Sequence, residues 1–140
     1  MASPTPPDPK RGSVITSTTQ GRIIRAFGAE LHFHLLGEQT EKRFLLASIL
    51  AQPGDGPPPH WHENEDECFI LQEGRLEFLS GGEWREVSAG GIVFTPKKSI
   101  HTYRNPGTTS AKMLVLALPA GFDVFFAECI RRWITFTAIT

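Results

Sequence analysis

The chain has few cysteines, no excess of charge of either sign and no long apolar run. Two cysteines among 140 residues, Cys68 and Cys129, are too few for a disulfide framework. Fourteen basic residues against fifteen acidic ones leave a net charge of −1, which gives no electrostatic support for nucleic-acid or anionic-membrane binding. No segment approaches the roughly 20 apolar residues that cross a bilayer. Residues 1–12 are polar and rich in proline, without a secretory signal. We therefore expect a soluble cytoplasmic protein without nucleic-acid or membrane partners.

What the sequence does have is apolar residues in short, regularly spaced groups. Hydrophobic residues make up 40% of the chain, including ten Phe and three Trp, which fits one globular domain with a substantial core. Turn residues recur about every ten positions, a spacing typical of an antiparallel β-sandwich or barrel. We predict a flexible tail over residues 1–12, a single all-β domain over 13–130 and an extension of unassigned structure over 131–140.

The pattern predicts strands at nine places. Strict alternation over Glu30–Leu35, for example, places Leu31, Phe33 and Leu35 on one face. The expected strands are Ser13–Thr18, Glu30–Leu35, Phe44–Ala51, Cys68–Leu71, Arg75–Leu79, Trp84–Val87, Ile92–Thr95, Thr102–Arg104 and Ala111–Leu118. After the break at Pro119-Ala120-Gly121, helical spacing over Phe122–Ile130 predicts one short amphipathic helix packed across the sheet.

Four residues form a candidate metal site: His60, His62, Glu67 and His101. His60 and His62 are two positions apart in an extended segment, so both imidazoles leave the same face. Glu67 begins the next strand across a polar turn, and His101 comes from a separate hairpin. Three imidazoles and one carboxylate suit a divalent transition metal and leave coordination positions open on a six-coordinate ion. The alternative is a site that stays unfilled or serves structure alone.

The spacing of these residues resembles the cupin superfamily. The first cupin motif, Gly-x5-His-x-His-x(3–4)-Glu-x6-Gly, is matched from Gly54 to Gly74. The second, Gly-x5-Pro-x-Gly-x2-His-x3-Asn, is matched from Gly90 to Asn105, except that Lys98 replaces the usual glycine. The resemblance covers roughly Phe44 to Leu118. It implies a six- to eight-stranded jelly-roll barrel with the metal inside, and often a homodimer. The ligand set admits Fe, Mn, Ni, Co or Zn as that metal. The segments 57–62 and 118–122 are similar to small single-domain cupins related to quercetin dioxygenases.

Other residues are candidates for a substrate pocket. Phe69 and Leu71 share the parity of Glu67, and we expect them and Phe94 to line an apolar pocket, although core packing explains the same residues. Tyr103 shares the parity of His101 and is a candidate catalytic residue, or else a packed aromatic. Cys68 points away from the site. A second pair, His32 and His34 with Glu30 on the same face, is a weaker metal candidate that lacks a partner motif, and exposed or pocket-rim histidines are the preferred explanation.

Three functions are consistent with these residues. We favour a metal-dependent dioxygenase that acts on a phenolic or polyketide-like metabolite through a metal-bound enolate, with Glu67 as ligand and base. The first alternative is a redox-neutral isomerase, cyclase or decarboxylase of secondary metabolism. The second is a non-catalytic small-molecule-binding protein. Both enzymatic functions take a small-molecule substrate, and the first also takes dioxygen.

Overall fold

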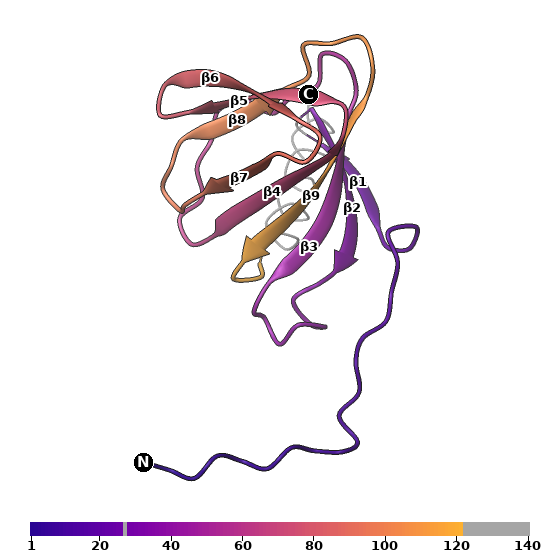
Figure 1. The fold of residues 1–140 in the computed structure, drawn as a ribbon, viewed down its shortest axis with the longest axis vertical. Coiled ribbons are helices and arrows are strands. Elements are labelled where there is room, and N and C mark those ends of the chain that lie inside the picture. Colours follow the sequence, from indigo (N-terminus) through magenta and orange to yellow (C-terminus); the bar gives the residue numbers. More distant parts are fainter. Residues whose placement is uncertain (27, 122–140) are drawn as a thin grey trace, which may run out of the picture.

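The computed structural model describes residues 1–26 and 28–121, and these form nine β-strands (Figure 1). No helix occurs within these two ranges, so none of the described segments could span a membrane as a helix. The strands are β1 (Ile23–Ala26), β2 (Ala29–Leu35), β3 (Leu45–Ala51), β4 (Asp66–Glu73), β5 (Arg75–Ser80), β6 (Glu83–Ser88), β7 (Ile92–Thr95), β8 (His101–Arg104) and β9 (Ala111–Leu118).

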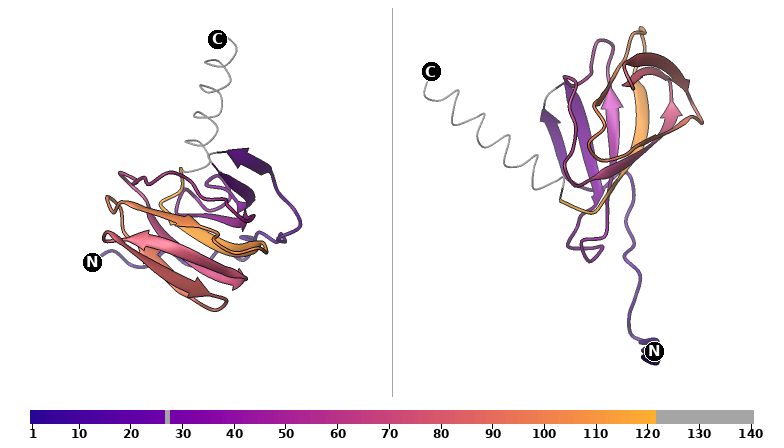
Figure 2. Two further views of the ribbon diagram at one scale, coloured as in Figure 1. Left: turned by 90° about the horizontal axis from the view of Figure 1, so that it is seen from above. Right: turned by 90° about the vertical axis from the view of Figure 1, so that its left-hand side faces the viewer.

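The strands form two antiparallel sheets that face each other as a jelly roll. The larger sheet has the order β1-β2-β3-β9-β4-β7 and the smaller has the order β6-β5-β8. The chain passes from the larger sheet to the smaller at Gly74, between β4 and β5. It returns to the larger sheet at β7, crosses to the smaller at β8 and ends in the larger at β9. Views from above and from the side show the two layers, with the N-terminal residues trailing away from them (Figure 2). The predicted all-β jelly roll is confirmed.

The core lies between the two sheets and follows the alternation of each strand. Leu31 and Phe33 on β2, and Met113 and Val115 on β9, are buried, whereas the residues between them are more exposed or face outward. Burying an aliphatic or aromatic side chain of this size contributes about 1.5–3 kcal/mol to stability. The alternation of apolar and polar residues that predicted these strands therefore also directs their apolar side chains into the core.

Eight of the nine predicted strands are present, with boundaries shifted by at most two residues. The prediction for Ser13–Thr18 is wrong: this segment forms no strand, and residues 1–23 are all exposed. β-Branched residues favour a strand only where a neighbouring strand and a buried face are available. The first strand is instead Ile23–Ala26, which pairs with β2 and was not predicted. The predicted helix Phe122–Ile130 and the extension 131–140 lie outside the described residues.

The loop 52–60 runs antiparallel to β8 and is fastened to it by backbone hydrogen bonds. The amide of Asn105 donates to Asp55 O at 3.0 Å, and the amide of Gly54 donates to Asn105 O at 3.0 Å. Gly56 lies so close to the strand that an added Cβ would stand 2.2 Å from Tyr103 O, so only glycine fits there. This fastening matters because the loop carries the first histidine of the candidate site.

Candidate metal centre

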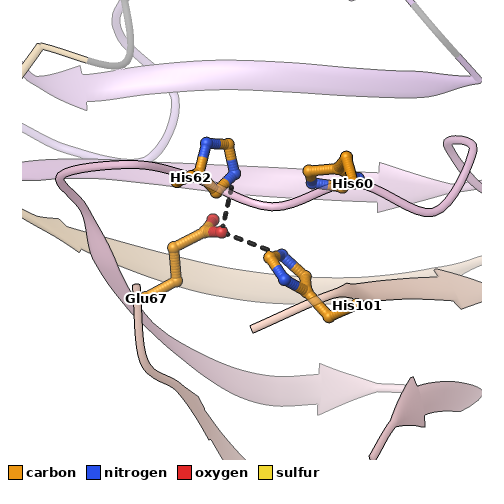
Figure 3. Close-up of side chains that lie close together, drawn as sticks. All are labelled: His60, His62, Glu67 and His101. Carbon is orange, nitrogen blue, oxygen red and sulfur yellow. Dashed lines mark hydrogen bonds and ion pairs between the residues drawn. The ribbon is translucent and has the colours of Figure 1, made fainter. Parts of the chain in front are cut away.

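His60, His62, Glu67 and His101 converge inside the barrel (Figure 3). Each offers one ligand atom, and these atoms all lie within 4.8 Å of one another. Glu67 comes from β4 of the larger sheet, His101 from β8 of the smaller, and the other two from the loop that precedes β4. His62, Glu67 and His101 are buried, and His60 is half-buried. The structure thus brings together all four residues that the sequence singled out.

Backbone contacts hold the two His segments in place. The amide of His60 donates to His101 O at 3.0 Å, and the amide of His101 donates to His60 O at 2.8 Å, so the two residues form an isolated β-bridge. The amide of Lys98 donates to His62 O at 2.8 Å. Residues 41 positions apart in the chain (60 and 101) therefore present their imidazoles from adjacent backbone.

Lys98, at the position where the motif usually has glycine, adopts a backbone conformation that favours glycine. Its φ is +66°, in the left-handed region that glycine adopts most readily. A side chain in this region costs about 1–2 kcal/mol. Lys98 Nζ also lies 3.5 Å from Glu63 Oε1, an exposed ion pair that contributes little. Lys98 therefore adopts a backbone conformation that glycine would adopt with less strain, and its amide still bonds to His62 O.

Two of the rings are oriented by carbonyl groups of the backbone. His60 Nδ1 lies 2.8 Å from Pro58 O, and His101 Nδ1 lies 2.9 Å from Ser99 O. A carbonyl can only accept, so in each ring Nδ1–H is the donor and Nε2 is directed toward the other site residues. Metal-binding histidines are commonly fixed in this way by a hydrogen bond at the second nitrogen.

The Glu67 carboxylate lies between two imidazoles. Its Oε1 is 3.0 Å from both His62 Nε2 and His101 Nε2. Burial alone would raise the pKa of Glu67, but the hydrogen bonds from His101 and His62 outweigh it and lower the pKa to about 2. Burial would likewise lower the pKa of His101, and the hydrogen bond to Glu67 outweighs it, so that this pKa is raised.

The pKa of His60 is shifted in the opposite direction to that of His101. Burial lowers the pKa of His60, and the nearby charges of His101 and His62 add to this effect against the hydrogen bond to Pro58. His60 is therefore neutral near pH 7, the form that binds a metal.

The donors fit a divalent transition metal. In the metal-free protein, the His101 imidazolium donates from Nε2 to Glu67 while Nδ1 donates to Ser99. A proton shared between a buried imidazole and a buried carboxylate stands where a cation can replace it. Three nitrogens and a carboxylate are compatible with iron, manganese, nickel, cobalt and zinc.

Three of the four predicted pocket residues face the barrel interior, next to the four site residues. Phe69, Leu71 and Tyr103 are all buried, as their parity with Glu67 and His101 predicts. The prediction for Phe94 is wrong, because its side chain is 63% exposed. The register pairs Glu67 with Thr95 and Cys68 with Phe94, so Phe94 and Cys68 share the outer face. Contact between the interior residues and a substrate remains a prediction.

One residue that shapes the interior was not predicted from the sequence. Phe78 is buried, and its ring lies 5.3 Å from that of Phe69 and 5.9 Å from that of Tyr103. The alternation of Leu76, Glu77 and Phe78 in β5 could have indicated it. Asn105, the last residue of the second motif, binds backbone groups: its Nδ2 donates to Ala51 O and Thr109 O, and its Oδ1 accepts from the Gly107 amide.

The second His-x-His pair, His32 and His34, does not form a comparable cluster. His32 Nε2 lies 3.1 Å from Glu30 Oε1, and His34 Nε2 lies 2.6 Å from Ser48 Oγ. Among residues 1–26 and 28–121, the only group of metal-binding side chains is the one around Glu67. His34 is buried, so it does not have the exposed position expected of it, whereas His32 is partly exposed.

Comparisons with known proteins agree with this architecture. A family model described as a cupin domain matches residues 48–117. The chain is 26% identical over 121 residues to quercetin 2,3-dioxygenase of Bacillus subtilis, covering 86% of this chain and 35% of that protein. It is 29% identical over 110 residues to an oxalate-binding protein of Thermotoga maritima, covering 77% and 91%. The structure of a polyketide cyclase from Streptomyces resistomycificus has a TM-score of 0.67 at 22% identity, covering 76% and 80%.

Proposed function

The chain belongs to the cupin domain family, and from this membership and the geometry of the site we propose that it is a metal-dependent enzyme acting on a small molecule. A dioxygenase that acts on a phenolic or polyketide-like compound is the favoured activity. The similarity to the Bacillus quercetin dioxygenase supports it, although the chain spans only about a third of that relative's length. One fold hosts many reactions, so the site has to carry the proposal.

The observation that carries the proposal is the convergence of four donors inside the barrel. Three of the four side chains are buried, and their ligand atoms all lie within 4.8 Å of one another. Hydrogen bonds to backbone carbonyls orient the rings of His60 and His101. A buried carboxylate and three imidazoles would be an expensive arrangement if it served packing alone. We therefore assign His60, His62, Glu67 and His101 as the metal ligands.

The side chains around the site divide the work of the reaction. A divalent ion held there supplies Lewis acidity, which lowers the pKa of an enol or phenol oxygen bound beside it. Glu67 is the only carboxylate of the four and is placed to take the substrate's proton on a carboxylate oxygen. The hydrogen bonds from His62 and His101 that lower the pKa of Glu67 to about 2 belong to the metal-free site, because the same Nε2 atoms would face the ion in the loaded one. Phe69 and Leu71 give the interior an apolar lining that keeps water from the ligand.

Two alternatives have specific support. The polyketide cyclase of the same fold supports a redox-neutral isomerase, cyclase or decarboxylase, in which the same deprotonation leads to rearrangement without dioxygen. The Thermotoga relative, which the chain covers over 91% of its length, is an oxalate-binding protein and supports a binding function without turnover. Dioxygen consumption separates the favoured activity from both alternatives.

We also propose that the protein is a homodimer, with the exposed apolar side chains of β4 and β7 in the interface. Ile92 is 67% exposed and Phe94 63%, and they pair with Ile70 and Cys68 on the outer face of the larger sheet. Contiguous apolar side chains on a surface commonly mark a contact with another protein. Light scattering after size exclusion should give a dimer for the wild type and a monomer for Phe94→Glu.

The first experiment is metal analysis by mass spectrometry on protein purified without a metal-binding tag. We expect about one equivalent of a divalent transition metal per chain, and its loss in His62→Ala/His101→Ala. A folded protein that holds no metal even after reconstitution would contradict the proposal. An electrode assay with phenolic substrates would then show whether dioxygen is consumed. Product without dioxygen consumption would favour the redox-neutral alternative, and tight binding without product would favour the binding protein.

A further inference from the structure

Tyr103 is buried in the second tier of the barrel interior, next to the metal ligands. It follows His101 by two residues on β8, so both side chains leave the same face. Its partner across the sheet is Phe78, and the partner of His101 is Ser80. A rise of about 3.4 Å per residue places the two tiers about 7 Å apart along the strand.

The Tyr103 hydroxyl differs from the other interior side chains because it is polar and has no partner in the described chain. The side chain is 4% exposed, and no hydrogen bond reaches its hydroxyl oxygen from residues 1–26 or 28–121. Leaving such a group unpaired costs about 1–3 kcal/mol, so buried tyrosine hydroxyls usually have a partner. A phenylalanine at this position would fill the same space without that cost.

The rings around Tyr103 form a continuous aromatic path from the metal ligands. The centroid of Phe69 lies 6.3 Å from that of His101 and 5.3 Å from that of Phe78. Phe78 in turn lies 5.9 Å from Tyr103. An aromatic ligand bound beside Glu67 through one oxygen or a chelating pair of oxygens would extend along these rings toward the Tyr103 tier.

We infer that the Tyr103 hydroxyl is a second recognition point, donating a hydrogen bond to an oxygen at the far end of an aromatic ligand bound at the metal centre. This inference rests on the proposed function and narrows its substrate class to aromatic compounds with two oxygen groups on opposite sides of a ring. Small dicarboxylates such as oxalate would reach only the first tier.

Two matched probes test this recognition point. Catechol carries only the chelating pair of oxygens, whereas 3,4-dihydroxyacetophenone adds a carbonyl acceptor across the ring. Affinities are measured by titration under anaerobic conditions on the metal-loaded wild type and on Tyr103→Phe, which removes only the hydroxyl. We expect the substitution to weaken 3,4-dihydroxyacetophenone binding roughly five- to tenfold and to change catechol binding less than twofold.

The other outcomes overturn the inference in distinguishable ways. Equal weakening of both probes would show that Tyr103 acts only through the structure of the site, and no weakening would show that the hydroxyl contacts no ligand. A metal-loaded wild type that binds neither probe would exclude this aromatic class while leaving the metal centre in place. Failure to hold a metal would instead contradict the proposed function, and metal analysis of the same samples identifies that case.

Discussion

The chain contains the pattern His-x-His twice, in His32-Phe33-His34 and in His60-Trp61-His62, and the two copies have different surroundings. The second copy lies in a loop fastened to β8 and meets Glu67 and His101 from both sheets. The first lies on the outer face of β2, where each ring has its own partner, Glu30 for one and Ser48 for the other. Two histidines at this spacing therefore join a larger group of potential metal-binding side chains only where the fold brings further donors to the same point.

The largest difference between the copies should be in metal affinity. Replacing His60 by Ala removes a ligand and should lower the affinity by roughly 100-fold or more, since even changes behind the ligands cost 10–100-fold. His32→Ala is the matched control and should leave the affinity unchanged. Competition with a chromogenic chelator measures both. A similar loss in the two variants would mean that the outer pair contributes to metal binding.

Acid should destabilise the metal-free protein through Glu67, which lies beside the second copy, His60-Trp61-His62. The folded pKa of Glu67 is about 2, below its ordinary value of 4.5, so its contribution to stability is fully present above pH 4.5 and is lost as the pH falls toward 2. The loss is on the order of 3 kcal/mol. His101 acts with the opposite sign: its raised pKa stabilises the fold below 6.5, and that contribution disappears as the pH rises through the folded value.

Urea unfolding at several pH values tests this dependence. The free energy of unfolding should decline less steeply between pH 4.5 and 2 in Glu67→Gln than in the wild type. His34→Gln, which changes the outer copy, should keep the wild-type slope. Parallel curves for wild type and Glu67→Gln would show that other carboxylates cause the acid sensitivity.

The first copy, His32-Phe33-His34, should contribute to the stability of the fold and not to metal binding. His34 Nε2 accepts from Ser48 Oγ at 2.6 Å while Nδ1 donates to Gln20 O at 3.3 Å, and both His34 and Ser48 are buried. Ser48→Ala leaves Nε2 without its partner and should reduce the free energy of unfolding by about 1–3 kcal/mol. Metal content should stay the same. Loss of metal in this variant would contradict the separation of the two copies.

The smallest effect concerns the turn that supports the inner copy. Lys98 has a φ of +66° and its amide donates to His62 O. Lys98→Gly removes the left-handed strain but adds the backbone freedom of glycine, so we expect a gain of less than about 1 kcal/mol. Thermal unfolding of the metal-free variant measures it. A clear loss of stability would show that the ion pair with Glu63 is worth more than its exposure suggests.

Most of the strands and the cluster of four candidate ligands could be predicted from the sequence, the strands from alternation along each segment and the cluster from the two motifs. Alternation over Glu30–Leu35 decided a strand, and the two cupin motifs identified His60 and His101 although they lie far apart. Register between strands is not encoded in this way. Phe94 was wrongly predicted to face the interior. Its orientation depends on the register between β4 and β7, which pairs it with Cys68 and not with Glu67. Ser13–Thr18 has the right residues but no neighbouring strand.

The origin of the four ligands has a consequence for how the barrel moves. Glu67 belongs to one sheet and His101 to the other, and the bridge between His60 and His101 adds the loop. An ion held by all of them would link the two sheets directly, in addition to their packing, the connecting chain and the hydrogen bonds that already join the 52–60 loop to the end of β8. The dissociation rate of the ion would then report how often the two sheets separate. Slow metal exchange would therefore measure the opening rate of the barrel.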